Sequence, residues 1–311
     1  MPTTTRTSTV ARIAVGIDGY PEGRDAAVLA TAIARATGAE LLLVAVHPDP
    51  LVVLPRGLTW TGLHEQAVAT LREVRDSLAA DARIAVETDF SIPRALGRVV
   101  RRDHRDLLVM GSSRHAPDRH VRIGKRTRQL LCHFESALAV APRGMHAGSE
   151  PKLGRIGVGY DGRPESQAAL RLAHEIAAGA GAELHICGVV DDRIRGAGEF
   201  GADAAPGVLP GLGWSSVGAA NAQFDERVSA AEQRLRDELE HAASVTGETV
   251  TSEVVRGRPA DRLLELAADV DLLVIGSRRW GPVARLMLGS TGEALLHDAP
   301  CAVVVVPRAH D

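Results

Sequence analysis

A pattern of small residues near the carboxyl end of the chain has the residue types that bind phosphate. Segment 275–291, IGSRRWGPVARLMLGST, carries one pair at Gly276-Ser277 and a second at Gly289-Ser290, on either side of a bulky cationic loop. A glycine at a strand end and a Gly-Ser pair at a helix start let backbone N–H groups approach a phosphate. The same residues also suit a simple turn, so the pattern alone leaves both interpretations open.

Two aspartates in similar surroundings add a carboxylate to this pattern. Asp18 lies in IDGYP and Asp161 in YDGRP, and each follows a short apolar run. At a strand end such a carboxylate can hydrogen-bond a ligand, whereas at a helix start it can cap the free backbone amides. The residues by themselves favour the capping role.

The chain contains two copies of one sequence pattern. ARIAVGIDG in the first copy reappears as GRIGVGYDG in the second, and DLLVMGSS reappears as DLLVIGSR. A polar stretch rich in breakers, 144–151, separates the copies. We therefore predict a first domain at 1–147 and a second domain at 148–311.

The second copy is longer than the first between its motifs. Asp161 follows Asp18 by 143 residues, whereas Gly276 follows Gly111 by 165. The additional residues fall in segment 194–220, which is rich in Gly, Ala and Pro and has no sustained period. This composition predicts a long surface loop.

Alternating strands and helices must position these motifs. Strands that are apolar throughout, such as DLLVIG, indicate a parallel sheet covered by helices on both faces. We therefore predict an α/β fold of two tandem open parallel five-stranded sheets, each with the strand order 3-2-1-4-5. In the second copy the pattern predicts strands at 156–160, 183–190, 249–255, 271–276 and 301–306, and helices at 164–180, 222–243, 259–268 and 290–297.

This architecture brings the motifs of the second copy together. In open α/β sheets a ligand binds beyond the carboxyl ends of the strands, where the strand order reverses. The first and fourth strands flank that reversal, so Asp161 and Gly276 are expected to face one crevice. Gly289 and Ser290 open the next helix, whose free N–H groups and positive dipole end attract an anion.

The motif Gly276-x2-Arg279-x9-Gly289-Ser290 resembles the signature of the universal stress protein family, Gly-x2-Gly-x9-Gly-Ser/Thr, whose ATP-binding members use it for phosphates. VGYDG, VRGRP and HDAPCAVVVVP resemble the family as well, and the resemblance covers nearly the whole chain, twice. It implies a tandem universal stress protein with a Rossmann-like, adenine nucleotide alpha hydrolase-like fold. The family's second glycine is Arg279 here, where a side chain adds strain if φ is positive but also places a guanidinium near the phosphates.

The resemblance also implies which residues contact a nucleotide. ATP, with or without Mg²⁺, would be the ligand, and Asp161 would hydrogen-bond its adenine or ribose. The residues implied in binding are Gly159, Tyr160, Asp161, Val189, Ile275, Gly276, Arg279, Gly289, Ser290 and Thr291 in the second copy, and Asp18, Val46, Gly111 and Gly124 in the first.

The first copy departs further from the family pattern. Arg114 replaces the second glycine and Lys125 replaces the Ser/Thr, and six Lys or Arg residues lie from Arg114 to Arg128. This half either is empty or binds an anion through side chains. A basic run of this kind is more often a solvated, salt-bridged face than a nucleic-acid site.

Composition excludes several classes of function. Of 311 residues, 45% are hydrophobic and 24% charged, and the net charge is −3, as in soluble globular proteins without an affinity for nucleic acid or membrane. Cys132, Cys187 and Cys301 are isolated and have no metal-ligand spacing, and the N-terminus lacks a signal-peptide pattern. We expect a cytoplasmic protein without a metal site.

The expected function is that of a stress-response ATP-binding module, a nucleotide-dependent regulatory or interaction protein with an unidentified protein partner. The alternatives are a weak ATPase or autophosphorylating enzyme and a ligand-free interaction scaffold. The resemblance implies that segments 138–141 and 302–306 pair within the chain as a pseudo-dimer, and this pairing would also cover the apolar edge at 303–306. A homodimer of the tandem is compatible with this arrangement.

Overall fold

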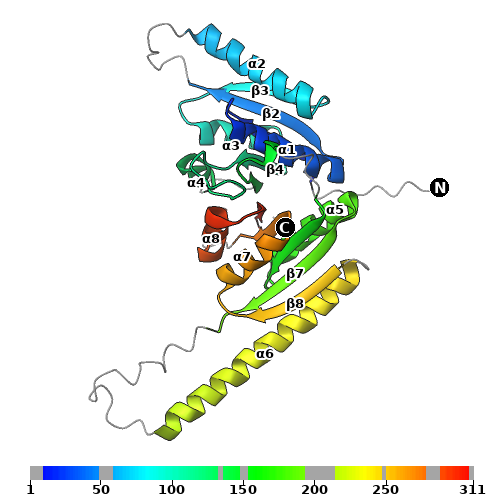
Figure 1. The fold of residues 1–311 in the computed structure, drawn as a ribbon, viewed down its shortest axis with the longest axis vertical. Helices are drawn as coiled ribbons and strands as arrows, with labels where there is room; N and C mark the ends of the chain where they lie inside the picture. Colours follow the sequence, from blue (N-terminus) through cyan, green and yellow to red (C-terminus); the bar gives the residue numbers. More distant parts are fainter. Residues whose placement is uncertain are drawn as a thin grey trace, which may run out of the picture.

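The computed structural model describes residues 10–48, 59–131, 136–147, 153–192, 214–246, 250–277 and 288–307. Within them, strands form one sheet with helices on both faces (Figure 1). The first repeat consists of β1 (Arg12–Ile17), α1 (Pro21–Thr37), β2 (Glu40–His47), α2 (Trp60–Leu78), β3 (Arg83–Thr88), α3 (Ile92–Arg102), β4 (Leu107–Gly111), α4 (Lys125–Leu131), β5 (Ala137–Ala141) and the 3₁₀ turn η1 (Met145–Ala147). The second repeat consists of β6 (Arg155–Tyr160), α5 (Pro164–Ala180), β7 (Glu183–Val190), α6 (Trp214–Thr246), β8 (Val250–Arg256), α7 (Pro259–Asp269), β9 (Leu272–Gly276), α8 (Ser290–Asp298) and β10 (Ala302–Val306).

The two repeats share one sheet. Its strand order is β3-β2-β1-β4-β5-β10-β9-β6-β7-β8, so each half has the predicted order 3-2-1-4-5 with parallel neighbours. At the centre, β5 and β10 pair antiparallel, with Val304 opposite Ala139. The predictions of α/β halves and of pairing between their last strands are confirmed, and this pairing makes the two halves one continuous sheet. Both central strands are buried along their whole length, so pairing removes two apolar edges.

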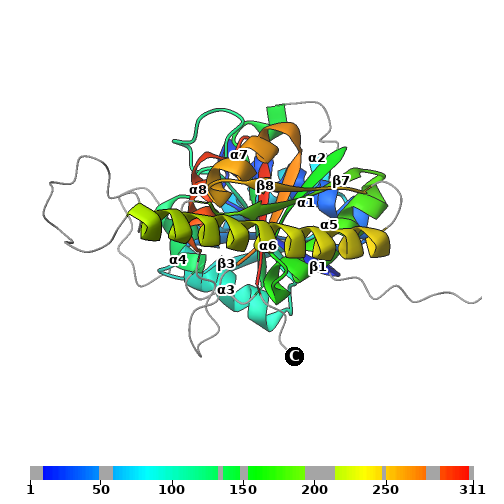
Figure 2. The ribbon, with the colours of Figure 1, turned by 90° about the horizontal axis from the view of Figure 1, so that it is seen from below.

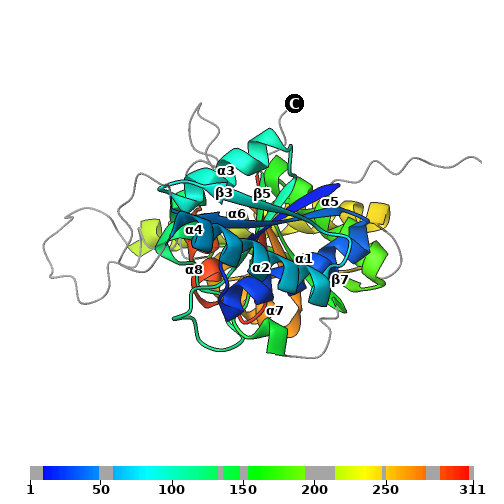
Figure 3. The same cartoon turned by 90° about the horizontal axis from the view of Figure 1, so that it is seen from above.

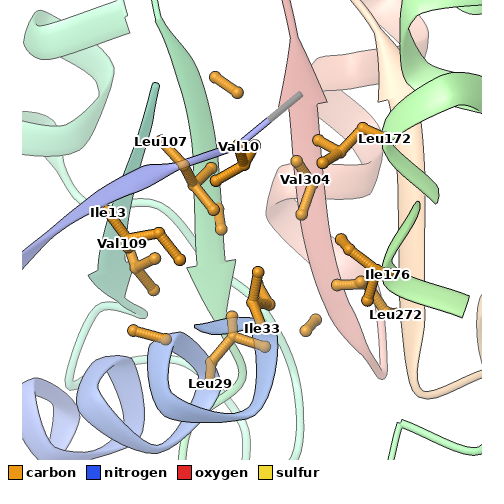
Figure 4. Close-up of a cluster of buried hydrophobic side chains, with 14 of the residues drawn as sticks. Val10, Ile13, Leu29, Ile33, Leu107, Val109, Leu172, Ile176, Leu272 and Val304 are labelled. Atoms are coloured by element: carbon orange, nitrogen blue, oxygen red, sulfur yellow. The ribbon is translucent and has the colours of Figure 1, made fainter. Parts of the chain in front are cut away.

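Helices cover the sheet in two layers. α1, α2, α5 and α6 pack on one hydrophobic cluster, and α3, α4, α7 and α8 pack on the other. Figure 3 shows α2 and α3 on opposite sides of the end strands, and Figure 2 shows α6 crossing the opposite end of the molecule. The first cluster is common to both repeats: Leu29 and Ile33 of α1 lie across from Leu172 and Ile176 of α5, with Val304 of β10 among them (Figure 4).

A buried carboxylate ties the end of the first repeat to its first helix. Asp25 of α1 is completely buried and accepts hydrogen bonds from the backbone N–H of Gly144 (2.9 Å) and of His146 (2.7 Å). The same carboxylate lies 2.6 Å from Nδ1 of His146. Because a buried carboxylate needs its partners, this contact fixes the position of η1 against α1.

The structure corrects one boundary in the second repeat. Residues 214–220, predicted to belong to a loop, form the first turns of α6, which begins at Trp214. Only Ala219 and Ala220 are strong helix formers in this stretch, and it has no apolar period, which was the signal used in the sequence. Residues 193–213 lie outside the described residues, and the domain boundary at 147/148 stays a prediction. In the described part of the chain, none of the helices has the length and apolar character needed to cross a membrane.

Candidate functional site

The turn between β6 and α5 forms one wall of the site. Gly162 has φ +77°, a left-handed conformation that favours glycine, and lets the chain reverse immediately after Asp161. One oxygen of the Asp161 carboxylate accepts a hydrogen bond from the N–H of Arg163 (3.2 Å), and the buried Ser166 hydroxyl donates to the Arg163 carbonyl (2.9 Å). The N-cap of α5 is Arg163, so Asp161 closes the preceding turn instead of capping the helix.

The glycine at the end of β9 is required by helix packing. A Cβ on Gly276 would lie 2.6 Å from the backbone carbonyl carbon of Glu165, in the first turn of α5. Gly111 of β4 has the same relation to Glu22 of α1, whose carbonyl oxygen would be 2.0 Å away. These glycines therefore admit the helix backbone against the strand end, which explains their presence in both repeats without a ligand.

The start of α8 presents free backbone donors. Gly289 is the N-cap, with φ −69° and ψ 170°, and as glycine it has no side chain with which to cap the helix. The first intrahelical bond runs from the N–H of Glu293 to the carbonyl of Gly289 (2.9 Å). The N–H groups of Ser290, Thr291 and Gly292 precede it and have no partner within the helix. Such a helix start has the donors and the dipole that suit an anion.

These elements surround one cavity of about 610 Å³ in the second repeat. That volume falls within the usual range for small-molecule sites, about 300–1,000 Å³. One part of the wall is apolar and the other is polar, as expected for a ligand with an aromatic and an ionic end. The apolar part consists of Cys187, Val189, Pro259, Leu263, Ile275 and Leu288, and the remainder consists of Gly159, Tyr160, Asp161, Arg163, Pro164, Glu165, Ser166, Gly276, Ser277, Gly289, Thr291 and Gly292.

The structure brings most of the predicted residues of the second repeat to this cavity. Ser290 is exposed and does not line it, although it opens α8. Arg279 lies outside the described residues. The predicted residues that do line the cavity are Gly159, Tyr160, Asp161, Val189, Ile275, Gly276, Gly289 and Thr291.

α7 and the interior of β7 also line the cavity, although the sequence motifs did not predict this. Pro259 and Leu263 are one helical turn apart on α7, and both line the cavity with Cys187 of β7. The VRGRP motif marked the start of α7, and the i, i+4 spacing of its next apolar residue was the available signal. Cys187 gave no such signal, because an isolated cysteine in an apolar run is typical of any core strand.

The corresponding crevice of the first repeat is nearly closed, at about 80 Å³. Asp18, Val46 and Gly111 line it, but Gly124 does not. Met110 occupies the position of Ile275, and its sulfur would lie 2.6 Å from a Cβ on Gly16. The thioether therefore packs against the β1 backbone, whereas in the second repeat Leu263 and Ile275 lie against the equivalent Gly159.

Backbone hydrogen bonds hold the loop that follows β4 in place. The N–H of Ser113 donates to the Arg122 carbonyl (2.7 Å), and the N–H of Arg119 donates to the Arg143 carbonyl (2.8 Å). The Arg143 guanidinium in turn donates to the Ala116 carbonyl (2.9 Å) and lies 3.1 Å from Asp118. Among the basic side chains, Arg122 and Arg128 pair with Asp298 and Glu293 of the second repeat, each at 3.6 Å. These contacts favour the first alternative for this half, an empty site.

Because two thiols are buried, we expect the free energy of unfolding to depend on pH in the alkaline range. Burial raises the pKa of Cys187, and likewise of Cys301, to about 12, whereas an unfolded thiol ionises near 9. The folded chain therefore holds more protons between these values, and its free energy of unfolding is expected to fall as pH rises above 9, by about 1 kcal/mol per thiol at pH 10. Urea denaturation at pH 8 and pH 10 measures this loss. A chain carrying Cys187→Ala and Cys301→Ala should lose less stability than the parent; equal losses would contradict the assignment.

Comparison with known proteins identifies the family. The model of the universal stress protein family matches residues 9–142, 152–206 and 208–307. A universal stress protein of Mycobacterium tuberculosis H37Rv is 26% identical over 306 residues, covering 96% of this chain and 97% of its own. A second universal stress protein of that strain is 26% identical over 322 residues, with 96% of each chain covered.

Solved structures show the same fold. A universal stress protein from Archaeoglobus fulgidus superposes with a TM-score of 0.68 at 18% identity, covering 97% of this chain and 100% of its own. A universal stress protein from Pseudomonas aeruginosa superposes with a TM-score of 0.60 at 18% identity, covering 96% of this chain and 93% of its own. With the family model matching both repeats, the chain belongs to the universal stress protein family.

Proposed function

We propose that this universal stress protein is a regulatory module that binds ATP in its second repeat. One observation carries the proposal: equivalent crevices of one chain enclose about 610 Å³ in the second repeat and about 80 Å³ in the first. The larger crevice combines an apolar slot, a carboxylate and the uncapped start of α8. Those three features match the base, the sugar and the phosphates of a nucleotide.

The apolar part of the cavity suits the base. Val189, Leu263 and Ile275 approach from β7, α7 and β9, so a planar ring would have aliphatic groups on both sides. Gly159 lets Leu263 and Ile275 approach the strand closely, because a Cβ there would lie 3.0 Å from Leu263 and 3.2 Å from Ile275. Asp161 is at the rim with a half-exposed carboxylate and can accept a hydrogen bond from a ribose hydroxyl or an adenine amino group.

The phosphates would lie at α8. Its first N–H groups, from Ser290 to Gly292, are donors without intrahelical partners, and the Thr291 side chain adds a hydroxyl. If Mg²⁺ accompanies the phosphates, Asp161 and Glu165 are the carboxylates that line the cavity among the described residues. Bound ATP would contact β6, β9, α5 and α8 together, so occupancy would couple elements from separate parts of the second repeat. This coupling is the basis of the proposed regulatory role.

Calorimetric titration with ATP tests the proposal by comparing alanine substitutions of the two equivalent aspartates, Asp161 and Asp18. The wild-type chain is expected to bind one ATP. Asp161→Ala should weaken binding about 10-fold or more, because it removes a hydrogen bond to a charged acceptor, whereas Asp18→Ala in the closed crevice should leave affinity unchanged. Two equal sites, or equal effects of the two substitutions, would refute a site confined to the second repeat. Sustained phosphate release that Asp161→Ala abolishes would indicate an enzyme instead.

A further inference from the structure

The loop that follows β4 in the first repeat reaches into the second repeat and holds the far end of α8. The N–H of Val121 donates to the carbonyl of Ala299 (2.7 Å), and the N–H of Ile123 donates to the carbonyl of Leu296 (2.9 Å). Both loop residues are buried in the same hydrophobic cluster as these acceptors. The last turn of α8 is therefore bonded to a different repeat.

The sequence of α8 explains why it needs an outside donor. In a continuing helix the Leu296 carbonyl would accept from residue 300, but that residue is Pro300 and has no N–H. Ile123 supplies the missing donor. Arg122, between the two donating residues, places its guanidinium 3.6 Å from the Asp298 carboxylate, and Arg128 lies 3.6 Å from Glu293.

The loop itself is anchored to the first repeat. The buried Ser112 hydroxyl donates to the Ala141 carbonyl at the end of β5 (2.8 Å) and accepts from the N–H of Arg122 (3.2 Å). Arg119 has φ +61°, an unfavourable conformation for a side chain that the neighbouring bonds to Arg143 maintain. The end of α8 is thereby braced against β5.

We propose that segment 119–123 of the first repeat is a positioning element for the nucleotide site of the second repeat, acting through α8. The inference rests on the proposed function, since Gly289, Thr291 and Gly292 at the other end of this helix line the cavity. α8 has nine residues and is about 13 Å long, so a small tilt at its braced end moves the phosphate donors by a substantial part of an ångström. Donors must be held to roughly 0.5 Å for strong binding. The first repeat thus has a role in binding although its own crevice is closed.

The test compares proline with alanine at one position. Ile123→Pro removes the N–H that bonds to Leu296, whereas Ile123→Ala removes side-chain packing but keeps that donor. Hydrogen exchange is measured without nucleotide at Glu293, whose N–H bonds to the Gly289 carbonyl, and at the following α8 amides. We expect exchange about 5-fold faster in Ile123→Pro than in Ile123→Ala, with β10 unchanged, and ATP affinity weaker by a similar factor.

A charge exchange provides the second arm. Arg122→Asp and Asp298→Arg should each accelerate α8 exchange slightly, and the double variant should restore it. Equal exchange in the proline and alanine variants, together with no restoration by the double variant, would overturn the proposal. If the wild-type chain binds no ATP, the proposed function fails, but exchange in the ligand-free protein still decides whether the loop positions α8.

Discussion

Gly289→Glu is expected to weaken ATP binding at least about 100-fold without lowering the melting temperature. The new carboxylate would stand at the N-cap of α8, compete for the N–H groups of Thr291 and Gly292, and repel the phosphates. The backbone of Gly289 has φ −69°, which any residue adopts, so the fold should tolerate the side chain. A negative charge at a helix start is itself favourable, and stability should be equal to that of the wild type or slightly higher.

The matched control is Gly124→Glu in the first repeat. Gly124 holds the corresponding sequence position, but it lies outside the small crevice, and a Cβ there would make only an ordinary contact, 3.9 Å from Ser113. ATP affinity should not change in this variant. Calorimetry on both proteins, with thermal melting of each, decides the matter: unchanged affinity in Gly289→Glu would show that the start of α8 does not bind phosphate.

The sequence predicted the fold well where local rules and the repeat agree. α5 begins at Pro164, as first-turn proline predicts, and ends before Gly181, whose φ of +65° is a standard helix C-cap. β7 also has its predicted bounds of 183–190. The predicted start of α6 was wrong, because residues 214–220 lack the apolar period on which the prediction depended. The bounds of an element are therefore predictable where its sequence has both an apolar period and recognisable residues at its ends.

The candidate site was predictable only in part. The family motif gave the residues at the ends of β6 and β9 and at the start of α8, because these positions are adjacent in any sheet of this strand order. The asymmetry between the repeats was suggested by Lys125 and Arg114, and in the structure the smaller crevice lies beside a loop after β4 that backbone hydrogen bonds hold in place. Contacts between residues far apart in sequence, such as Ile123 with Leu296, have no local signal.

Gly276 shows how one residue type can satisfy two requirements. The sequence suggested that glycine admits a phosphate, and the structure shows that it admits the backbone of α5. Gly111 meets the same requirement in the first repeat, where the crevice is closed. Conservation of the pattern between the repeats therefore reflects helix packing at this position. The ligand hypothesis rests on the cavity and on α8.

The second large effect concerns the contact between the repeats. Gly179→Ala is expected to lower the free energy of unfolding by about 3 kcal/mol. Gly179 lies near the end of α5, which packs against α1, and a Cβ there would be only 1.7 Å from the carbonyl oxygen of Ala36. A backbone oxygen cannot rotate away, so the two helices would have to separate. Alanine alone would favour the helix by up to about 1 kcal/mol, so a measured loss must come from the contact.

Gly97→Ala provides the matched control on α3, away from this contact. A Cβ at Gly97 would meet only the end of the flexible Arg101 side chain, at 3.5 Å, so this variant should gain about 0.5–1 kcal/mol from helix propensity. Urea denaturation of both variants gives the two free energies. If Gly→Ala lowers the free energy of unfolding at position 179 and raises it at position 97, the loss must come from the close contact between α1 and α5. A gain in Gly179→Ala would mean that the repeats can separate there without cost, and that β5, β10 and the loop bound to α8 suffice to hold them together.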